Sequence, residues 1–213
     1  MRYYIADCHF FHEALNREMD HRGFASVEEM NEYMIKRWNE KVRNRDEVVI
    51  LGDLSMGNAE QTNALLDRLQ GKLFLIVGNH DNRYLRSKTF HKERFGWIYP
   101  YAELHDDGRK VVLSHYPIAC YNGQYLKNKK GEPRTYMLYG HVHDSHDERL
   151  IEQYQQMVEK TRIPDRDGGT QSLSSHMINC FCMYSDYQPL SLDEWIALTK
   201  QRLIRCQNVE DSL

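Results

Sequence analysis

Seven side chains that can donate nitrogen or oxygen to a metal ion occur in five separate stretches of the chain. Each stretch follows a short apolar run, and the donors are Asp7 with His9, Asp53, Asn79, His115, and His141 with His143. Imidazole, carboxylate and amide donors without a thiolate suit manganese, iron, zinc or nickel better than a structural zinc site. Seven donors exceed the four that one tetrahedral ion takes. Two divalent ions about 3.5–4 Å apart, bridged by a carboxylate, would use them all.

The spacing within the first and last stretches supports a shared site. Asp7 and His9 are two residues apart, as are His141 and His143. In an extended chain, side chains at this spacing point the same way. For a single histidine, a helix cap, a turn or a satisfied polar position would be the better explanation. Seven residues that share one kind of location favour a common metal site instead.

Two further histidines lie next to these donors. His80 follows Asn79 in the run Gly78-Asn79-His80-Asp81, and an imidazole can supply a proton near neutral pH. His12 follows the first motif and could reach the same site as the metal donors, although a lone histidine is more often a surface or hydrogen-bonded residue. The chain therefore offers candidates for proton transfer as well as for holding ions.

The elements that must carry the first three motifs alternate between strand and helix. Apolar runs predict strands over 2–6, 47–51 and 73–77, and amphipathic stretches predict helices over 27–43 and 59–69. Met30, Met34, Trp38 and Val42 recur near helical spacing, and we interpret this stripe as core packing. Such alternation is typical of an α/β fold, in which ligands bind outside the carboxyl ends of the strands.

The second half of the chain predicts more strands and one excursion. Strands are expected over 98–104, 110–113, 135–139 and 176–184, and helices over 144–160 and from Ser191 to about Leu203. Asp106-Asp107-Gly108-Arg109 predicts a hairpin between the first two of these strands. Residues 161–175 predict a flexible excursion. The stretch 144–175 is charged but has an apolar stripe that needs something to pack on, so we expect a lid or a dimer contact beside the site.

Composition predicts a soluble globular protein of a reducing compartment. The chain has 213 residues, 41% of them apolar, and its net charge of −3 gives no strong footprint for bulk nucleic-acid binding. No apolar run approaches the ~18 residues of a membrane span, and the amino terminus becomes polar too soon for a signal peptide. The five cysteines predict no disulfide framework, and Cys180 with Cys182 lacks a second pair for zinc. We therefore expect half-buried strand thiols and a cytoplasmic location.

The order of the motifs resembles a known family. Asp-x-His, Gly-Asp, Gly-Asn-His-Asp, Ser-His and Gly-His-x-His follow one another as in the calcineurin-like metallophosphoesterases, most like their compact bacterial and phage-type members. The resemblance covers 7–143 and includes the last strand. It implies an α/β fold: a four-layer αββα sandwich of two mixed sheets flanked by helices. We expect residues 1–213 to form a single domain, with an insertion at about 144–175.

The resemblance also implies a role for each motif. One ion would take Asp7, His9, Asp53 and His143, and a second would take Asp53, Asn79, His115 and His141, with manganese the first choice of metal. A water or hydroxide between the ions would attack phosphorus, and His80 would protonate the leaving oxygen, with Asp81 orienting it or balancing its charge. His12 and Arg83 are expected substrate contacts. The run Leu54-Ser55-Met56-Gly57 lacks a further acidic residue, which argues against the larger protein-phosphatase branch.

The expected activity is hydrolysis of a phosphodiester or phosphomonoester, with a small molecule or nucleotide as substrate. Two alternatives stay open: a non-catalytic scaffold that kept the fold, and a nuclease with a local basic patch of Lys127, Lys129, Lys130 and Arg134. The complete donor set argues against the first, and the acidic balance argues mildly against the second. We expect no membrane partner, and a homodimer is a further alternative.

Overall fold

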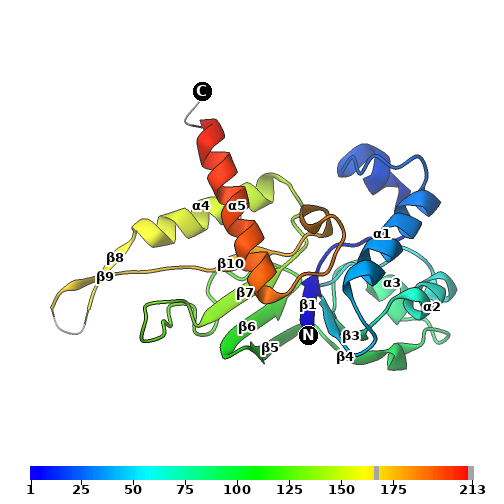
Figure 1. Cartoon of the computed structure of the whole chain (residues 1–213), viewed down its shortest axis with the longest axis horizontal. Coiled ribbons are helices and arrows are strands. Elements are labelled where there is room, and N and C mark those ends of the chain that lie inside the picture. The colour runs from blue at the N-terminus through cyan, green and yellow to red at the C-terminus, as the bar shows by residue number, and fades with distance from the viewer. Residues whose placement is uncertain (166–167, 211–213) are drawn as a thin grey trace.

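Eight of the described strands form two sheets that pack face to face, with helices on the outer faces (Figure 1). The computed structural model describes residues 1–165 and 168–210. The first sheet is parallel, in the order β1 (Arg2–Ile5), β2 (Glu47–Ile50), β3 (Lys72–Ile76), β4 (Phe95–Tyr99). The second sheet is mixed, in the order β10 (Met177–Asn179), β7 (Thr135–Tyr139), β6 (Arg109–Ser114), β5 (Tyr101–Asp106). The predicted α/β sandwich is confirmed, although only the second sheet is mixed.

Strands β1 and β6 are buried on both faces of their sheets, and their successive side chains point to opposite faces. In β1, Tyr3 and Ile5 pack among helix residues on the outer side, whereas Tyr4 belongs to the core between the sheets. In β6, Val112 packs outward and its neighbour Val111 packs inward. Strands that are buried on both faces are expected to have near-continuous apolar sequences.

Helices cover the two outer faces of the sandwich. α1 (Val27–Lys41) and α2 (Ala59–Arg68) pack on the first sheet, and α4 (His146–Lys160) packs on the second. α5 (Leu192–Glu210) begins between the sheets, where Trp195 Nε1 donates a hydrogen bond of 2.9 Å to the carbonyl of Tyr4. The predicted stripe of Met30, Met34, Trp38 and Val42 is buried, as expected. No helix in the described part of the chain has both the length and the apolar character that crossing a membrane requires.

Three predicted elements differ from the observed ones. The strand expected over 98–104 is two strands, because the chain passes from the first sheet to the second at Pro100, which has no N–H for pairing. The strand expected over 176–184 ends at Asn179 and is followed by a 3₁₀-helix at Cys182–Ser185. The excursion 161–175 contains a hairpin of β8 (Arg162–Pro164) and β9 (Thr170–Ser172), and residues 166–167 lie outside the described residues.

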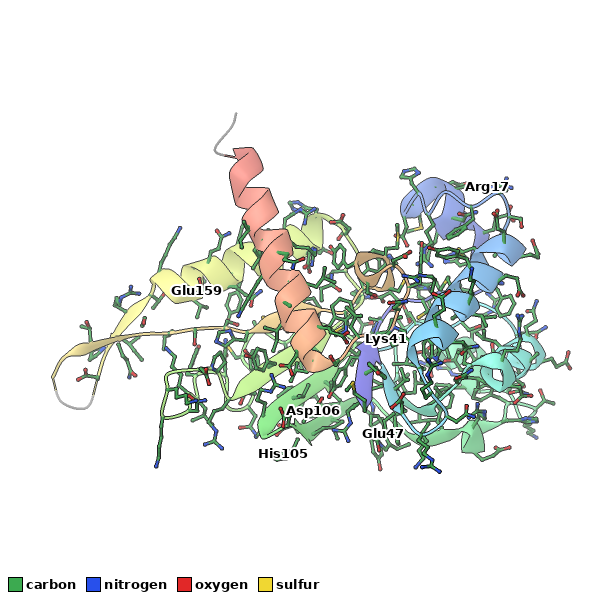
Figure 2. The ribbon with its side chains drawn as sticks, viewed as in Figure 1. Arg17, Lys41, Glu47, His105, Asp106 and Glu159 are labelled. Atoms are coloured by element: carbon green, nitrogen blue, oxygen red, sulfur yellow. The ribbon has the colours of Figure 1, made fainter. Side chains whose placement is uncertain are left out.

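Parallel pairing brings the carboxyl ends of most strands to one edge of the sandwich. Glu47, at the start of β2, and Asp106, at the end of the antiparallel β5, mark the opposite edge (Figure 2). Arg17 belongs to a π-helix, Leu15–Met19, whose first and last residues line a cavity at the carboxyl edge (Figure 2). A short helix, α3 (Asn82–Leu85), follows the Gly78-Asn79-His80-Asp81 motif. The loops that follow the strands therefore meet where the sequence places its polar donors.

Candidate metal centre

Six of the seven predicted donors form two clusters at the carboxyl edge. The first cluster consists of Asp7, His9 and His143, and the second of Asp53, His115 and His141. Within each cluster the potential ligand atoms lie within 4.8 Å of one another. Each cluster takes residues from loops that are far apart in sequence, so both exist only in the folded chain. His141 and His143, which the spacing predicted to point the same way, lie in different clusters.

Asp53 and Asn79 connect these groups. Asp53 Oδ2 lies 3.6 Å from His9 Nε2 of the first cluster and 3.4 Å from His115 Nε2 of its own. Asn79 Oδ1 lies 2.9 Å from His115 Nε2 and 3.0 Å from His141 Nδ1, which places the seventh donor at the second cluster. Asp53 therefore stands between the clusters, where a bridging carboxylate would be needed.

The arrangement of the imidazoles fits a pair of metal ions. His9 Nε2 and His143 Nε2 face each other at 3.2 Å, and His143 Nε2 lies 3.8 Å from Asp7 Oδ1. Nitrogen and oxygen donors that converge at such distances are suited to a divalent cation. The buried cysteines Cys8, Cys180 and Cys182 belong to neither cluster, and Cys180 and Cys182 are the predicted strand thiols. The donor set is thus free of thiolate, and the expectation that these thiols are half-buried is wrong.

The backbone at five of the donors has a left-handed conformation. The φ angle is 55° at Asp7, 48° at His9, 52° at Asp53, 72° at His141 and 49° at His143. Non-glycine residues adopt this region rarely, although aspartate and histidine are enriched in it. Each such residue costs on the order of 1–3 kcal/mol, and clusters of them mark functional sites. The extended backbone that the spacing predicted at 7–9 and 141–143 is therefore wrong, although the side chains still converge.

Two motif glycines are required by close approach to the carboxylates. A β-carbon on Gly78 would overlap the Asp53 carboxylate, and one on Gly140 would overlap that of Asp7. The amide of His141, just after Gly140, donates to both oxygens of Asp7 at 2.9 and 3.0 Å. The glycine in each motif thus lets a neighbouring strand end come within bonding distance of a donor.

Asp81 holds loops together and does not orient His80. Its buried carboxylate accepts hydrogen bonds of 2.9 Å from the amides of Asp53 and Leu54, 2.7 Å from that of Gly78, and 2.7 Å from the Tyr84 hydroxyl. None of these four bonds reaches the His80 imidazole. These bonds give Asp81 a structural role, and a part in balancing the charge of His80 stays a prediction.

The clusters open into a cavity of about 350 Å³ that also contains the two extra histidines. The side chain of His80 is 42% exposed, and its Nε2 lies 4.0 Å from Asp53 Oδ2. The His12 ring lies 5.5 Å from that of His9, and both line the cavity. Arg83 is exposed on α3 and is not among the residues that line the cavity, so the structure does not support it as a substrate contact.

Several cavity residues were not predicted from the sequence. Asp20 lines the cavity and accepts a hydrogen bond of 2.8 Å from His143 Nδ1. The π-helix that precedes Asp20 contributes Leu15 and Met19. Residues 13–25 show neither helical nor strand periodicity, and only the charged run Asp20-His21-Arg22 sets them apart. The charged run alone does not indicate that Asp20 contacts His143.

The insertion 144–175 starts at the cavity, and its β8–β9 hairpin lies away from it. Asp147, in the first turn of α4, lines the cavity. The buried Glu148 accepts a hydrogen bond of 3.0 Å from Asn179 Nδ2, which also donates at 2.9 Å to the carbonyl of His143. The β8–β9 hairpin at the far end of the insertion projects away from the two sheets (Figure 1). A role as lid or dimer contact stays a prediction.

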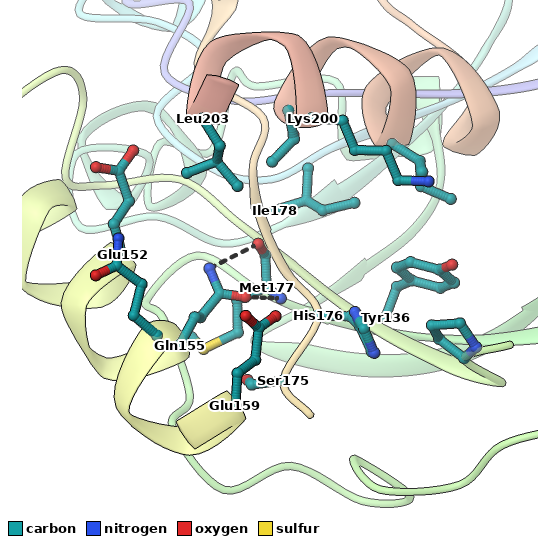
Figure 3. A pocket seen from close by; sticks show the side chains of 14 residues that line it. Tyr136, Glu152, Gln155, Glu159, Ser175, His176, Met177, Ile178, Lys200 and Leu203 are labelled. Carbon is teal, nitrogen blue, oxygen red and sulfur yellow. Dashed lines mark hydrogen bonds between the residues drawn. The ribbon is translucent and has the colours of Figure 1, made fainter. Parts of the chain in front are cut away.

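A second cavity, of about 390 Å³, lies between α4 and α5 (Figure 3). Gln155 of α4 forms part of its wall and exchanges hydrogen bonds of 2.7 and 3.3 Å with the backbone of Met177. None of the predicted site residues lines this cavity. It is therefore separate from the metal centre.

Charges within the centre shift the pKa values of its members. Burial raises the pKa of Asp7 to about 6. Burial would also raise that of Asp53, but the hydrogen bond and charge of His115 outweigh it and lower the pKa to about 2. Burial would lower the pKa of His115, but its contacts with Asp53 and Asp7 raise it to about 9. The metal-free centre therefore holds a proton on His115 at neutral pH.

Metal binding is expected to release this proton. A histidine binds metal in its neutral form, so the apparent affinity for Mn²⁺ should rise about tenfold per pH unit from pH 7 and level off above a pH of about 9. Calorimetric titrations at pH 7.5, in buffers of different ionisation enthalpy, should show release of about one proton per His115 site. The variant His115→Asn should lose this release, and a pH-independent affinity of the unsubstituted protein would contradict the prediction.

Comparisons with known proteins identify chains that are similar to this one. The chain is 31% identical over 209 residues to the uncharacterized protein MJ1445 of Methanocaldococcus jannaschii, with 97% of this chain and 96% of that protein covered. It is 28% identical over 167 residues to the gene 66 protein of Mycobacterium phage L5, with 66% of this chain and 76% of that protein covered. The solved protein of unknown function AQ665 from Aquifex aeolicus shares its fold, with a TM-score of 0.63, 23% identity, and coverage of 93% and 98%.

A family model provides the assignment. The model described as calcineurin-like phosphoesterase matches residues 3–195, a range that includes every donor of both clusters. The resemblance of the motif order is thereby confirmed. With its two-sheet α/β sandwich and two groups of histidine and aspartate that could hold metal ions, this chain belongs to the calcineurin-like phosphoesterase family.

Proposed function

We propose that the protein hydrolyses phosphate esters with two divalent metal ions. The observation that carries this proposal is the pair of His/Asp clusters, four members of which line one cavity, with Asp53 between the clusters. A shared carboxylate is what a two-ion site needs to hold its ions about 3.5–4 Å apart. The family supports phosphate-ester hydrolysis as the general class of reaction.

The donor residues divide into two sets. The first ion would be held by Asp7, His9 and His143, the second by Asn79, His115 and His141, and both by Asp53. When bound, the two ions would neutralise the phosphoryl oxygens and lower the pKa of a water between them. Among the candidate metals, the donor set is compatible with manganese, which we favour.

His80 is placed to act as the general acid. Its amide donates a hydrogen bond of 2.9 Å to Asp53 Oδ1, which fixes the backbone at the edge of the centre. Its imidazole is partly exposed in the cavity, with Nε2 on the side of Asp53. An alkoxide leaves poorly, so a proton delivered by this imidazole to the departing oxygen would speed bond cleavage. The backbone of His80 is therefore fixed, while its imidazole remains accessible to a substrate in the cavity.

The lining of the cavity favours a small substrate with one phosphate group. None of its fourteen residues is lysine or arginine, and Asp20, Asp144 and Asp147 add carboxylates. Binding of nucleic acid depends on cationic side chains along the phosphate backbone. Lys127 and Arg134 are exposed in the loop before β7 and line no part of the cavity. A small diester or monoester is therefore the substrate class that we propose.

Removal of metal is the direct test of this function. Protein dialysed against a chelator should not hydrolyse p-nitrophenyl phosphate or bis-p-nitrophenyl phosphate, and added Mn²⁺ should restore turnover. Free Mn²⁺ at about 100 times its Kd should also raise the free energy of unfolding by about 2.7 kcal/mol for each ion bound. Folded protein that binds two ions per chain but turns over neither ester, with any divalent metal, would reject the proposal.

A further inference from the structure

Asp20 connects a member of the first cluster to a buried arginine. Asp20 Oδ1 accepts a hydrogen bond of 2.8 Å from His143 Nδ1. Its other oxygen, Oδ2, accepts bonds of 3.0 Å from Arg22 Nε and 2.9 Å from Arg22 Nη2. The side chains of Asp20 and Arg22 are 8% and 0% exposed, so the pair is not a mobile surface contact. A carboxylate with both oxygens engaged in this way is held in one orientation.

Arg22 extends the connection to the backbone turn that carries Asp7 and His9. Arg22 Nη1 donates a hydrogen bond of 2.7 Å to the carbonyl of Cys8, and Nη2 donates one of 3.1 Å to the carbonyl of Asp7. Cys8 lies between Asp7 and His9, which both have left-handed backbones. One guanidinium therefore supports the strained turn that presents two donors, and through Asp20 it also supports the third.

The hydrogen bond from His143 determines which of its ring nitrogens can bind a metal. A neutral imidazole that donates its Nδ1 hydrogen to a carboxylate has its lone pair on Nε2. His143 Nε2 is the atom that lies 3.2 Å from His9 Nε2 and 3.8 Å from Asp7 Oδ1. Carboxylates behind metal-binding histidines fix the tautomer and the ring orientation, and their loss typically lowers metal affinity about 10–100-fold. His9, by contrast, has a buried Nδ1 without a partner among the described residues.

We propose that Asp20 and Arg22 are positioning residues for the first ion site and control its affinity separately from the second. The proposal rests on the two-ion centre described under the proposed function, but not on its catalytic activity. Their hydrogen bonds to the first site go to the His143 ring and to the carbonyls of Asp7 and Cys8, and among the described residues none of their bonds reaches the second cluster. The second ion site therefore serves as an internal control for folding.

The test measures metal affinity in the variant Asp20→Asn. Metal-free protein is titrated with Mn²⁺ in competition with a chromophoric chelator, and the unsubstituted protein should bind two ions. In Asp20→Asn the first ion should bind about 10–100-fold more weakly, while the affinity for the second stays unchanged. Turnover of bis-p-nitrophenyl phosphate should fall at low Mn²⁺ and recover as Mn²⁺ is raised. In Arg22→Lys the loss should again be confined to the first ion, because one ammonium cannot make all of these contacts.

Two further variants keep the outcome decisive. Asp186→Asn removes a carboxylate that also pairs with an arginine, Arg37, and both ions should bind it normally. His115→Asn removes a donor of the second cluster, so this variant should retain the first ion. Adding Asp20→Asn to it should weaken the binding of that remaining ion. The proposal would be overturned if folded Asp20→Asn bound both ions equally more weakly, or if its affinity for both ions were unchanged. Selective weakening without any hydrolysis in the unsubstituted protein would support the positioning role while rejecting the phosphoesterase function.

Discussion

Replacing Asp53 with asparagine is expected to lower kcat for bis-p-nitrophenyl phosphate by about 10³-fold and to leave at most one tightly bound ion. Asp53 Oδ2 is within 3.6 Å of a histidine from each cluster, so it is placed to serve both ions. Asparagine keeps the shape of the side chain and tolerates the left-handed backbone, whose φ is 52°. The amide also retains an oxygen that can accept the hydrogen bond from the His80 amide. Turnover and bound metal, measured on the same sample, check the result.

Asp186 provides a matched control for this substitution. It has a left-handed φ of 49°, and its carboxylate accepts a hydrogen bond of 2.9 Å from the Tyr33 hydroxyl. It does not line the cavity, so Asp186→Asn should keep two ions and full turnover. If Asp53→Asn behaved like this control, the bridging role of Asp53 would be wrong.

Replacing His80 with glutamine is expected to affect substrates according to their leaving group. For a diester with an alkyl leaving group, kcat should fall by about 10²–10⁴-fold, because the departing alkoxide needs a proton. For p-nitrophenyl esters the loss should be small, because p-nitrophenolate leaves without protonation. Metal content should stay at two ions, since His80 belongs to neither cluster. Rates for both substrate types, compared at saturating Mn²⁺, measure the effect.

His12→Gln is the informative comparison for His80→Gln. His12 and His80 are the two imidazoles that line the cavity without belonging to a cluster. A substrate contact at His12 should raise KM for both leaving groups alike. A leaving-group effect at His12 and none at His80 would show that the general acid has been assigned to the wrong histidine.

Much of the site could be predicted because its information is local in the chain. Asn79 and Asp53 follow apolar runs directly, and a buried parallel strand needs only a short run of such residues to be recognised. The carboxyl ends of parallel strands share an edge, so donors that follow several strands are expected to meet. The apolar runs therefore indicated both the α/β fold and the edge at which these side chains converge.

Other parts of the site depend on contacts between distant segments. Asp20 and Arg22 sit in a stretch without periodicity, and their importance comes from His143, 123 residues after Asp20. The resemblance implied a catalytic role for Asp81, whereas only the folded chain shows that its carboxylate also joins three amides and a hydroxyl from separate segments. Arg83 was expected at the substrate, and the turn of α3 leaves it exposed outside the cavity.

The sequence by itself determined the fold class, the donor residues and the edge of the sandwich where they gather, because hydrophobic periodicity and strand direction are short-range properties. Only the tertiary structure decided which nitrogen of His143 faces Asp7 and that Asp20 lies behind its ring. It also decided that Pro100 separates two sheets. These features depend on left-handed backbones and close approaches that isolated segments would not adopt, and packing against the rest of the chain offsets their cost.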